Sequence, residues 1–82
     1  MNNSLYNDFA AHFAAASLTS LVESFNRQVG NWGWTSARAA HDMALIAELK
    51  RRGIDMSAIY DGQSVSFARR VVLDNNRLVI AE

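Results

Sequence analysis

The feature that most constrains the fold of this chain is a change in the spacing of its apolar residues at Gly53. Before this glycine, apolar residues recur every three or four positions, which is the period of an amphipathic helix. After it, apolar and polar residues alternate, which is the period of a β-strand. A length of 82 residues leaves room for one domain. The sequence therefore predicts a single α+β domain over residues 1–82, a two-layer sandwich of N-terminal helices packed on a C-terminal antiparallel β-meander.

Two helices are predicted before Gly30. The first runs from about Leu5 to Ala16, and the second from about Leu18 to Val29. The apolar stripe of the second does not continue that of the first, which indicates a break between them. A single bent helix from Leu5 to Val29 is the alternative.

A third helix is predicted from Ser36 to Arg52, with Thr35 or Ser36 as its N-cap. At about 100° per residue, its apolar side chains gather on one broad face, which we expect to be buried. That face carries Ala39, Ala40, Met43, Ile46, Ala47 and Leu49. The opposite face, expected to be exposed, carries Arg38, His41, Glu48, Arg51 and Arg52.

The C-terminal segment is predicted to contain a hairpin. Alternation from Ser64 to Leu73 indicates a long strand, and a last strand follows from Arg77 to Ala81. Asn75 and Asn76 form the turn between them, because asparagine tolerates positive φ. In this register Leu73 faces Leu78 and Val71 faces Ile80, so the apolar pairs share one side of the hairpin.

The last strand covers only half of the long one, so a further partner is expected. Asp61-Gly62 is a strong hairpin signal, and it favours Ala58–Tyr60 as a third strand folded back on the first half of the long one. The competing interpretation is a short helical turn from Met56 to Ile59, capped by Asp55. The meander thus has two or three strands.

Charge and composition exclude several classes of protein. Eight basic and eight acidic residues give a formal net charge of zero. A dedicated nucleic-acid binder usually has a basic excess, because neutralising phosphates supplies much of its affinity. The N-terminus lacks the basic and apolar segments of a signal peptide, and the longest stretch without charged residues, Phe9–Val22, is too short to span a membrane. We expect a cytoplasmic protein with no membrane partner and without nucleic acid as its main partner.

No pattern of residues indicates catalysis or metal binding. Cysteine is absent, and His12 and His41 stand at no spacing that pairs them with a second metal ligand. The four single glycines match neither a phosphate-binding loop nor a nucleophile elbow. The sequence predicts no catalytic residue, no metal site and no cofactor, and therefore a protein that is not an enzyme.

The least generic segment is the loop before the third helix, where Trp32 and Trp34 flank Gly33. Tryptophan and arginine are the residue types that most often anchor protein interfaces, and Arg38 follows one turn into the helix. We therefore predict that Trp32, Trp34 and Arg38 form a binding site. The alternative is that the tryptophans are structural and fill a gap in a small core.

Three runs of residues resemble short uncharacterised bacterial proteins, some of them in mobile-element settings. The runs are Gly33-Trp34-Thr35-Ser36-Ala37-Arg38-Ala39, Leu49-Lys50-Arg51-Arg52-Gly53-Ile54-Asp55 and Ser57-Ala58-Ile59-Tyr60-Asp61-Gly62. The resemblance implies a bacterial protein and brings no activity and no site residue with it.

The function expected from these observations is that of a non-enzymatic protein-binding or accessory module, which acts on a protein partner or forms a homodimer. The alternative is a winged-helix-like DNA-binding regulator, which would read DNA with the third helix and use residues 74–77 as its wing. The balanced charge counts against that alternative, and six arginines favour it: Arg38, Arg51, Arg52, Arg69, Arg70 and Arg77. A small hydrolase or ligand-binding enzyme is the second alternative.

Overall fold

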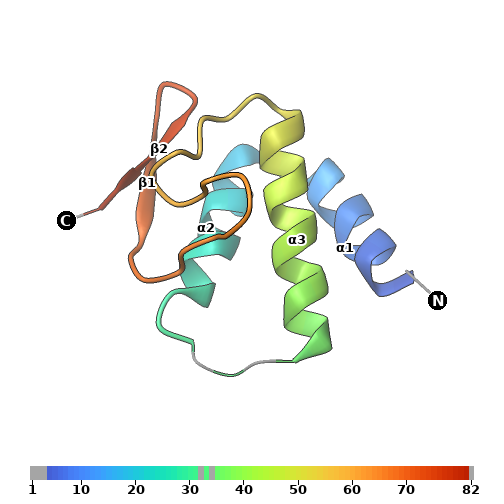
Figure 1. Ribbon diagram of the computed structural model, residues 1–82. Coiled ribbons are helices and arrows are strands. Elements are labelled where there is room, and N and C mark those ends of the chain that lie inside the picture. The colour runs from blue at the N-terminus through green and yellow to red at the C-terminus, as the bar shows by residue number, and fades with distance from the viewer. Residues whose placement is uncertain (1–3, 32, 34, 82) are drawn as a thin grey trace.

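The computed structural model describes residues 4–31, 33 and 35–81, and in these ranges three helices precede a β-hairpin. The elements are α1 (Ser4–Ala15), α2 (Leu18–Gln28), α3 (Ser36–Arg51), β1 (Val71–Asp74) and β2 (Arg77–Ile80). The hairpin lies beside α2, and α1 lies on the far side of α3 (Figure 1). The predicted α+β class, with helices first and strands last, is confirmed.

Local capping explains where the helices begin. The Ser17 side chain accepts a hydrogen bond from the Ser20 N–H at 3.1 Å, which starts α2 at Leu18 and separates it from α1. The alternative of one bent helix is therefore wrong. Thr35 caps α3 in the same way, accepting from the Arg38 N–H at 3.0 Å. None of the helices within the described ranges is long and apolar enough to cross a membrane.

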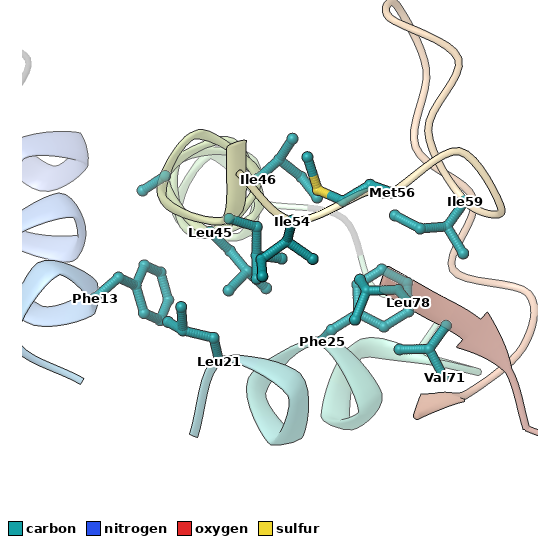
Figure 2. Close-up of a cluster of buried hydrophobic side chains, with 12 residues drawn as sticks. Phe13, Leu21, Phe25, Leu45, Ile46, Ile54, Met56, Ile59, Val71 and Leu78 are labelled. Atoms are coloured by element: carbon teal, nitrogen blue, oxygen red, sulfur yellow. The ribbon is translucent and has the colours of Figure 1, made fainter. Parts of the chain in front are cut away.

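The core is one cluster of buried side chains gathered around α3. Leu45 and Leu49 of α3 are fully buried, as are Leu21 and Phe25 of α2 (Figure 2). The remaining members, from α1, α3, the 54–59 segment and the hairpin, are Phe13, Ala44, Ile46, Ile54, Met56, Ile59, Val71 and Leu78. Burial of apolar side chains from every element is the main force that holds so short a chain together.

The predicted faces of α3 are partly wrong. Met43, expected to be buried, is 64% exposed, and Glu48, expected to be exposed, is 6% exposed. The reason is that α3 packs on both α1 and α2, so its buried arc includes Ala44 and Leu45 as well as Ile46 and Leu49. That arc reaches Glu48 and leaves Met43 and Ala47 outside it.

The hairpin has the predicted register. Leu73 pairs with Leu78 and Val71 pairs with Ile80. The turn residues Asn75 and Asn76 have φ values of 50° and 64°, the left-handed conformation that a two-residue turn of this kind requires. Turn chemistry and apolar alternation agree here, so they fix which side of the hairpin meets the core.

The long strand and the third strand are wrong predictions. Strand β1 covers only residues 71–73 of the expected 64–73 segment and ends at Asp74. Ala58–Tyr60 lies in a helical turn in which the N–H groups of Ile59 and Tyr60 both donate to the Met56 carbonyl at 2.9 Å. Asp55 caps this turn by accepting from the Ser57 N–H, as the competing interpretation expected. What remains of the third strand is one antiparallel bridge between Tyr60 and Val65.

The chain bends at residues 68 and 69, and just before this bend the Phe67 side chain packs against the helices. Its ring stacks on Phe25 of α2 with the ring centroids 4.7 Å apart. Burying an aromatic ring against another outweighs the few ladder hydrogen bonds that a short strand would add.

Candidate binding groove

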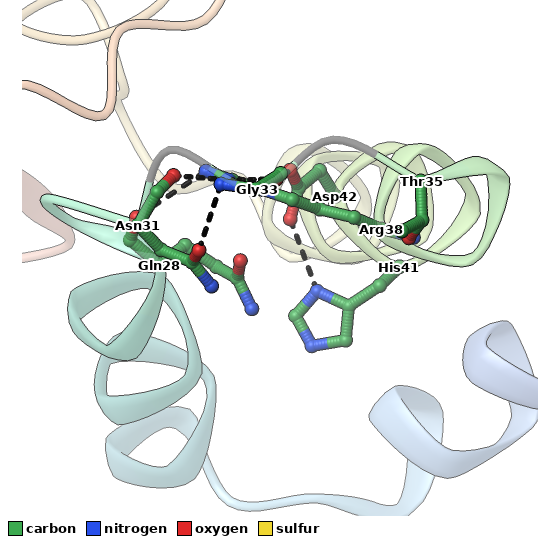
Figure 3. Close-up of polar contacts among 7 residues, drawn as sticks. All are labelled: Gln28, Asn31, Gly33, Thr35, Arg38, His41 and Asp42. Atoms are coloured by element: carbon green, nitrogen blue, oxygen red, sulfur yellow. Dashed lines mark hydrogen bonds and ion pairs between the residues drawn. The ribbon is translucent and has the colours of Figure 1, made fainter.

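Arg38, a predicted site residue, sits at the start of α3 and holds the chain that follows α2. Its guanidinium donates to the carbonyl oxygens of Gln28 at 3.3 Å and Gly33 at 2.7 Å, and also to that of Asn31 (Figure 3). On its other side it pairs with Asp42 at 3.4 Å. These carbonyls belong to the C-terminal end of α2 and to the loop after it, where a cation is favourable to the helix dipole. The Arg38 side chain is 14% exposed, so most of it is covered by these neighbours and little of it is open to solvent.

Asp42 and His41 continue this polar cluster toward α1. The Nδ1 atom of His41 lies 3.1 Å from the Oδ1 atom of Asp42 (Figure 3). The His41 ring meets the rings of Phe9 and Phe13 nearly at right angles, with both centroid distances 5.1 Å. His41 was expected on an exposed face, and it lies instead between α1 and α3. Within the described ranges no three side chains of His, Asp or Glu come together as metal ligands.

A groove of about 620 Å³ opens beside Arg38, and we refer to it as the α3 groove. It is lined by Gly30, Asn31, Gly33, Arg38, Ala39, Asp42, Met43, Gln63, Val65, Ser66, Phe67 and Ala68. One wall is the first half of α3, where Ala39 and Met43 supply apolar surface. The other is the 63–68 segment, where Val65, Phe67 and Ala68 do the same. A volume of this size is typical of ligand and peptide sites.

Phe67 and Arg38 join the two walls at the floor of the groove. The Arg38 guanidinium carbon lies 5.7 Å above the centre of the Phe67 ring, while the other face of the floor is formed by the Phe25–Phe67 stack. A guanidinium over an aromatic face is a favourable contact, and it is stronger when water is partly excluded. Through its stack on Phe25, the Phe67 ring ties the floor of the groove to the core.

The 63–68 wall has one open backbone edge. The N–H of Ser66 donates to the Ile59 carbonyl at 2.8 Å, and the Ser64 carbonyl accepts from the Asp61 N–H at 3.3 Å. In an extended segment alternate residues point their backbone groups to opposite edges. Val65 faces Tyr60 in an antiparallel bridge whose hydrogen bonds are made by its neighbours, so the N–H and C=O groups of Val65 point away from residues 59–61.

Both edges of the hairpin are partly closed. The side-chain amide of Asn26 accepts from the N–H of Val71 at 2.8 Å and donates to its carbonyl at 2.9 Å, which occupies the outer edge of β1. Asp55 pairs in a parallel bridge beside β2, where its carbonyl accepts from the Leu78 N–H at 2.9 Å. A polar side chain or a single bridging residue in these places hinders the addition of another strand.

The arginines at the C-terminal end of α3 have a structural role. Glu48 accepts from Arg51 at 3.0 and 2.6 Å and from Arg52 at 2.6 Å. Hydrogen bonds from Arg51, opposed by burial and helped by those from Arg52, lower the pKa of the Glu48 carboxyl from its ordinary 4.5 to about 2. Arg52 also donates to the carbonyls of Phe13 and Ala16, at 3.0 and 2.7 Å, at the end of α1. Arg38 and Arg52, which the winged-helix alternative would use on DNA, are therefore engaged inside the protein.

The structure places only part of the predicted binding site. Arg38 lies at the α3 groove, whereas Trp32 and Trp34 lie outside the described residues. Met43, Val65 and Phe67 were not predicted as site residues, because apolar residues at helix and strand spacing indicate core first. Nothing in the sequence distinguishes Met43, an exposed methionine of α3, from the buried apolar residues near it on the same helix. Comparison with family models, with curated proteins and with solved structures found no match to this chain.

Proposed function

We propose that this chain is a non-enzymatic protein-binding module and that its binding surface is the α3 groove. The observation that carries the proposal is the exposure of Met43, 64%, on the wall of a groove whose opposite wall is also apolar. A large apolar side chain held on a rigid helix beside a concave surface is typical of a site that a partner covers.

The charged residues that line the α3 groove favour a partner whose contacting surface is uncharged. Arg38 and Asp42 are its two charged lining residues, and they pair with each other. A buried contact here would therefore meet no uncompensated charge, which would be expensive to desolvate. An apolar side chain of the partner, seated between Met43 and Phe67, fits this arrangement.

The prediction for the tryptophan loop becomes part of this proposal. Gly33, which stands between Trp32 and Trp34 in the sequence, lines the groove. We retain the expectation that one ring stabilises the fold and the other contributes to binding beside Arg38. The proposal also keeps a cytoplasmic bacterial protein as its setting and a protein partner, or a second copy of the chain, as the bound species.

The experiment is site-specific photocrosslinking in the native host. A photoreactive phenylalanine analogue replaces Met43 in the groove or, as a matched control, Val72, which is 49% exposed on the hairpin. We expect a discrete crosslinked protein from position 43 that disappears when Ala39 is changed to Glu, and none from position 72. A crosslink from position 72 alone would move the binding surface to the hairpin and overturn the proposal.

A further inference from the structure

The break between α1 and α2 lies in a stretch of chain whose composition favours a continuous helix. Residues 4–28 contain neither glycine nor proline, and three consecutive alanines, residues 14–16, stand just before the break. Alanine has the highest helix propensity of all residues. At Ser17 the φ of −69° is already helical, and the ψ of 157° is the angle that departs from the helix. The break is therefore not imposed by a residue that is unable to be helical.

The Arg52 side chain stabilises this break. Its guanidinium donates to three carbonyl oxygens at the end of α1, those of Phe13 at 3.0 Å, Ala14 at 3.4 Å and Ala16 at 2.7 Å. In an unbroken helix these carbonyls would accept from the N–H groups four residues ahead. The N–H group four residues after Ala16 donates instead to the Ser17 hydroxyl. Arg52 and the Ser17 cap thus replace backbone hydrogen bonds that a fused helix would form.

The first helix is attached to the rest of the fold mainly through α3. Among the described helices and strands, α3 is the one with which α1 makes extensive contact. The Phe9 and Phe13 rings of α1 meet the ring of His41 nearly at right angles, with both centroid distances 5.1 Å. Because α1 and α2 point in different directions (Figure 1), a helix that fused them would carry α1 away from α3 and uncover this surface.

We propose that the chain exchanges α1 with a second copy of itself. In the exchanged dimer α1 and α2 form one helix over residues 4–28, and α1 of each copy packs on α3 of the other. The surface identifies its occupant, since the side of α3 that α1 leaves is complementary to the α1 of an identical chain. The second copy returns the same contacts, so the buried surface of α1 is kept. This inference is independent of the α3 groove, whose lining among the described residues includes none from α1.

The balance between the single chain and the exchanged dimer is decided at the junction of the two helices. The core contacts of α1 are the same in both forms, whereas Arg52 bonds the α1 carbonyls only while the helices are separate. Bringing two chains together costs entropy, so the dimer is favoured at high chain concentration. A substitution at the junction acts twice, because each dimer contains two junctions.

The test compares Ser17→Ala with Ser17→Gly in the full chain. Both changes remove the capping hydroxyl at an exposed residue, but alanine favours a fused helix and glycine disfavours it. Each variant is unfolded in urea and refolded at high concentration, and sedimentation equilibrium measures its association constant. We expect the constant for Ser17→Ala to exceed that for Ser17→Gly by about tenfold or more. Equal constants, or two variants that both remain monomeric, would overturn the proposal.

NMR of a mixed sample identifies the surface through which the dimer forms. Chains of Ser17→Ala with and without ¹³C are unfolded together, refolded and searched for NOEs between a labelled Phe13 and an unlabelled His41. Exchange places these rings, 5.1 Å apart, on different chains, so we expect such NOEs. A dimer whose Phe13–His41 NOEs all lie within one chain associates through another surface and contradicts the exchange.

A second pair of variants tests the role of Arg52. Arg52→Ala frees the α1 carbonyls and should raise the association constant, whereas Arg51→Ala takes an arginine from Glu48, leaves those carbonyls bonded and should match wild type. If Arg52→Ala leaves the buried carboxylate too poorly balanced to fold, Glu48→Gln combined with Arg52→Ala, compared with Glu48→Gln alone, replaces it. An association constant no higher without Arg52 than with it would show that Arg52 does not hold the two helices apart.

Discussion

Replacing Glu48 by Gln should reveal how much the buried carboxylate stabilises the fold. The lowering of its pKa from 4.5 to about 2 corresponds to about 3 kcal/mol of preferential stabilisation of the ionised form. Arg51 is 64% exposed, so solvent screens its share, and we expect a loss of about 2 kcal/mol at pH 7. For a domain of this size that loss lowers Tm by about 8–15 °C.

The dependence on pH separates charge from packing. The folded pKa lies below the unfolded one, so the contribution is fully present above about pH 4.5 and is lost as the pH falls toward 2. Urea denaturation of wild type and Glu48→Gln should therefore give a difference in unfolding free energy that falls to less than half its pH 7 value at pH 3. Glu23→Gln, the same change at an exposed position of α2, is the control and should stay within about 0.5 kcal/mol of wild type. An equal difference for Glu48→Gln at both pH values would refute the electrostatic explanation.

Three further predictions concern the fold. Asn26→Ala leaves both backbone groups of Val71 unpaired and should destabilise the protein by about 2 kcal/mol, with faster NMR-detected exchange of the Val71 amide; unchanged exchange would contradict the edge-closing role. Leu45→Ala should lose about 2–5 kcal/mol in chemical denaturation and Met43→Ala less than about 0.5, and similar losses would mean that Met43 is core. Asn75→Val, at a φ of 50°, should lower stability by about 1–3 kcal/mol while Asn75→Gly is nearly neutral in thermal unfolding; a tolerated valine would show that the turn has another conformation.

Local signals were sufficient to predict the hairpin and the helix starts. The pairing of Leu73 with Leu78 follows from two asparagines between alternating apolar runs, and the start of α3 follows from Thr35 before a helical pattern. In each case the residues that determine the structure are within a few positions of one another. The prediction therefore requires no knowledge of contacts with residues far away in the sequence.

The predictions that proved wrong are those in which contacts between residues far apart in the sequence determine the structure. Periodicity placed Glu48 on the exposed face, but α1 covers that side of α3 and two arginines balance the carboxylate there. Alternation extended the strand through Phe67, but this ring is stacked on Phe25, which lies far from it in the sequence.

The candidate site shows the same division. Arg38 was predicted as a residue type common at interfaces, whereas its contacts with Gln28 and Gly33 depend on how α2 ends beside α3. The exposure of Met43 on the groove wall likewise depends on how α1 and α2 cover α3.

The attachment of the loop carbonyls to Arg38 has a consequence for the kinetics of the groove. The backbone N–H of Arg38 is the group that Thr35 caps, while its side chain holds the carbonyl of Gly33 on the groove lining. Opening of the first turn of α3 therefore releases that stretch of lining in the same event. We therefore expect that Thr35→Val, which removes the capping hydroxyl at a residue outside the groove lining, loosens this part of the lining by increasing fraying at the start of α3.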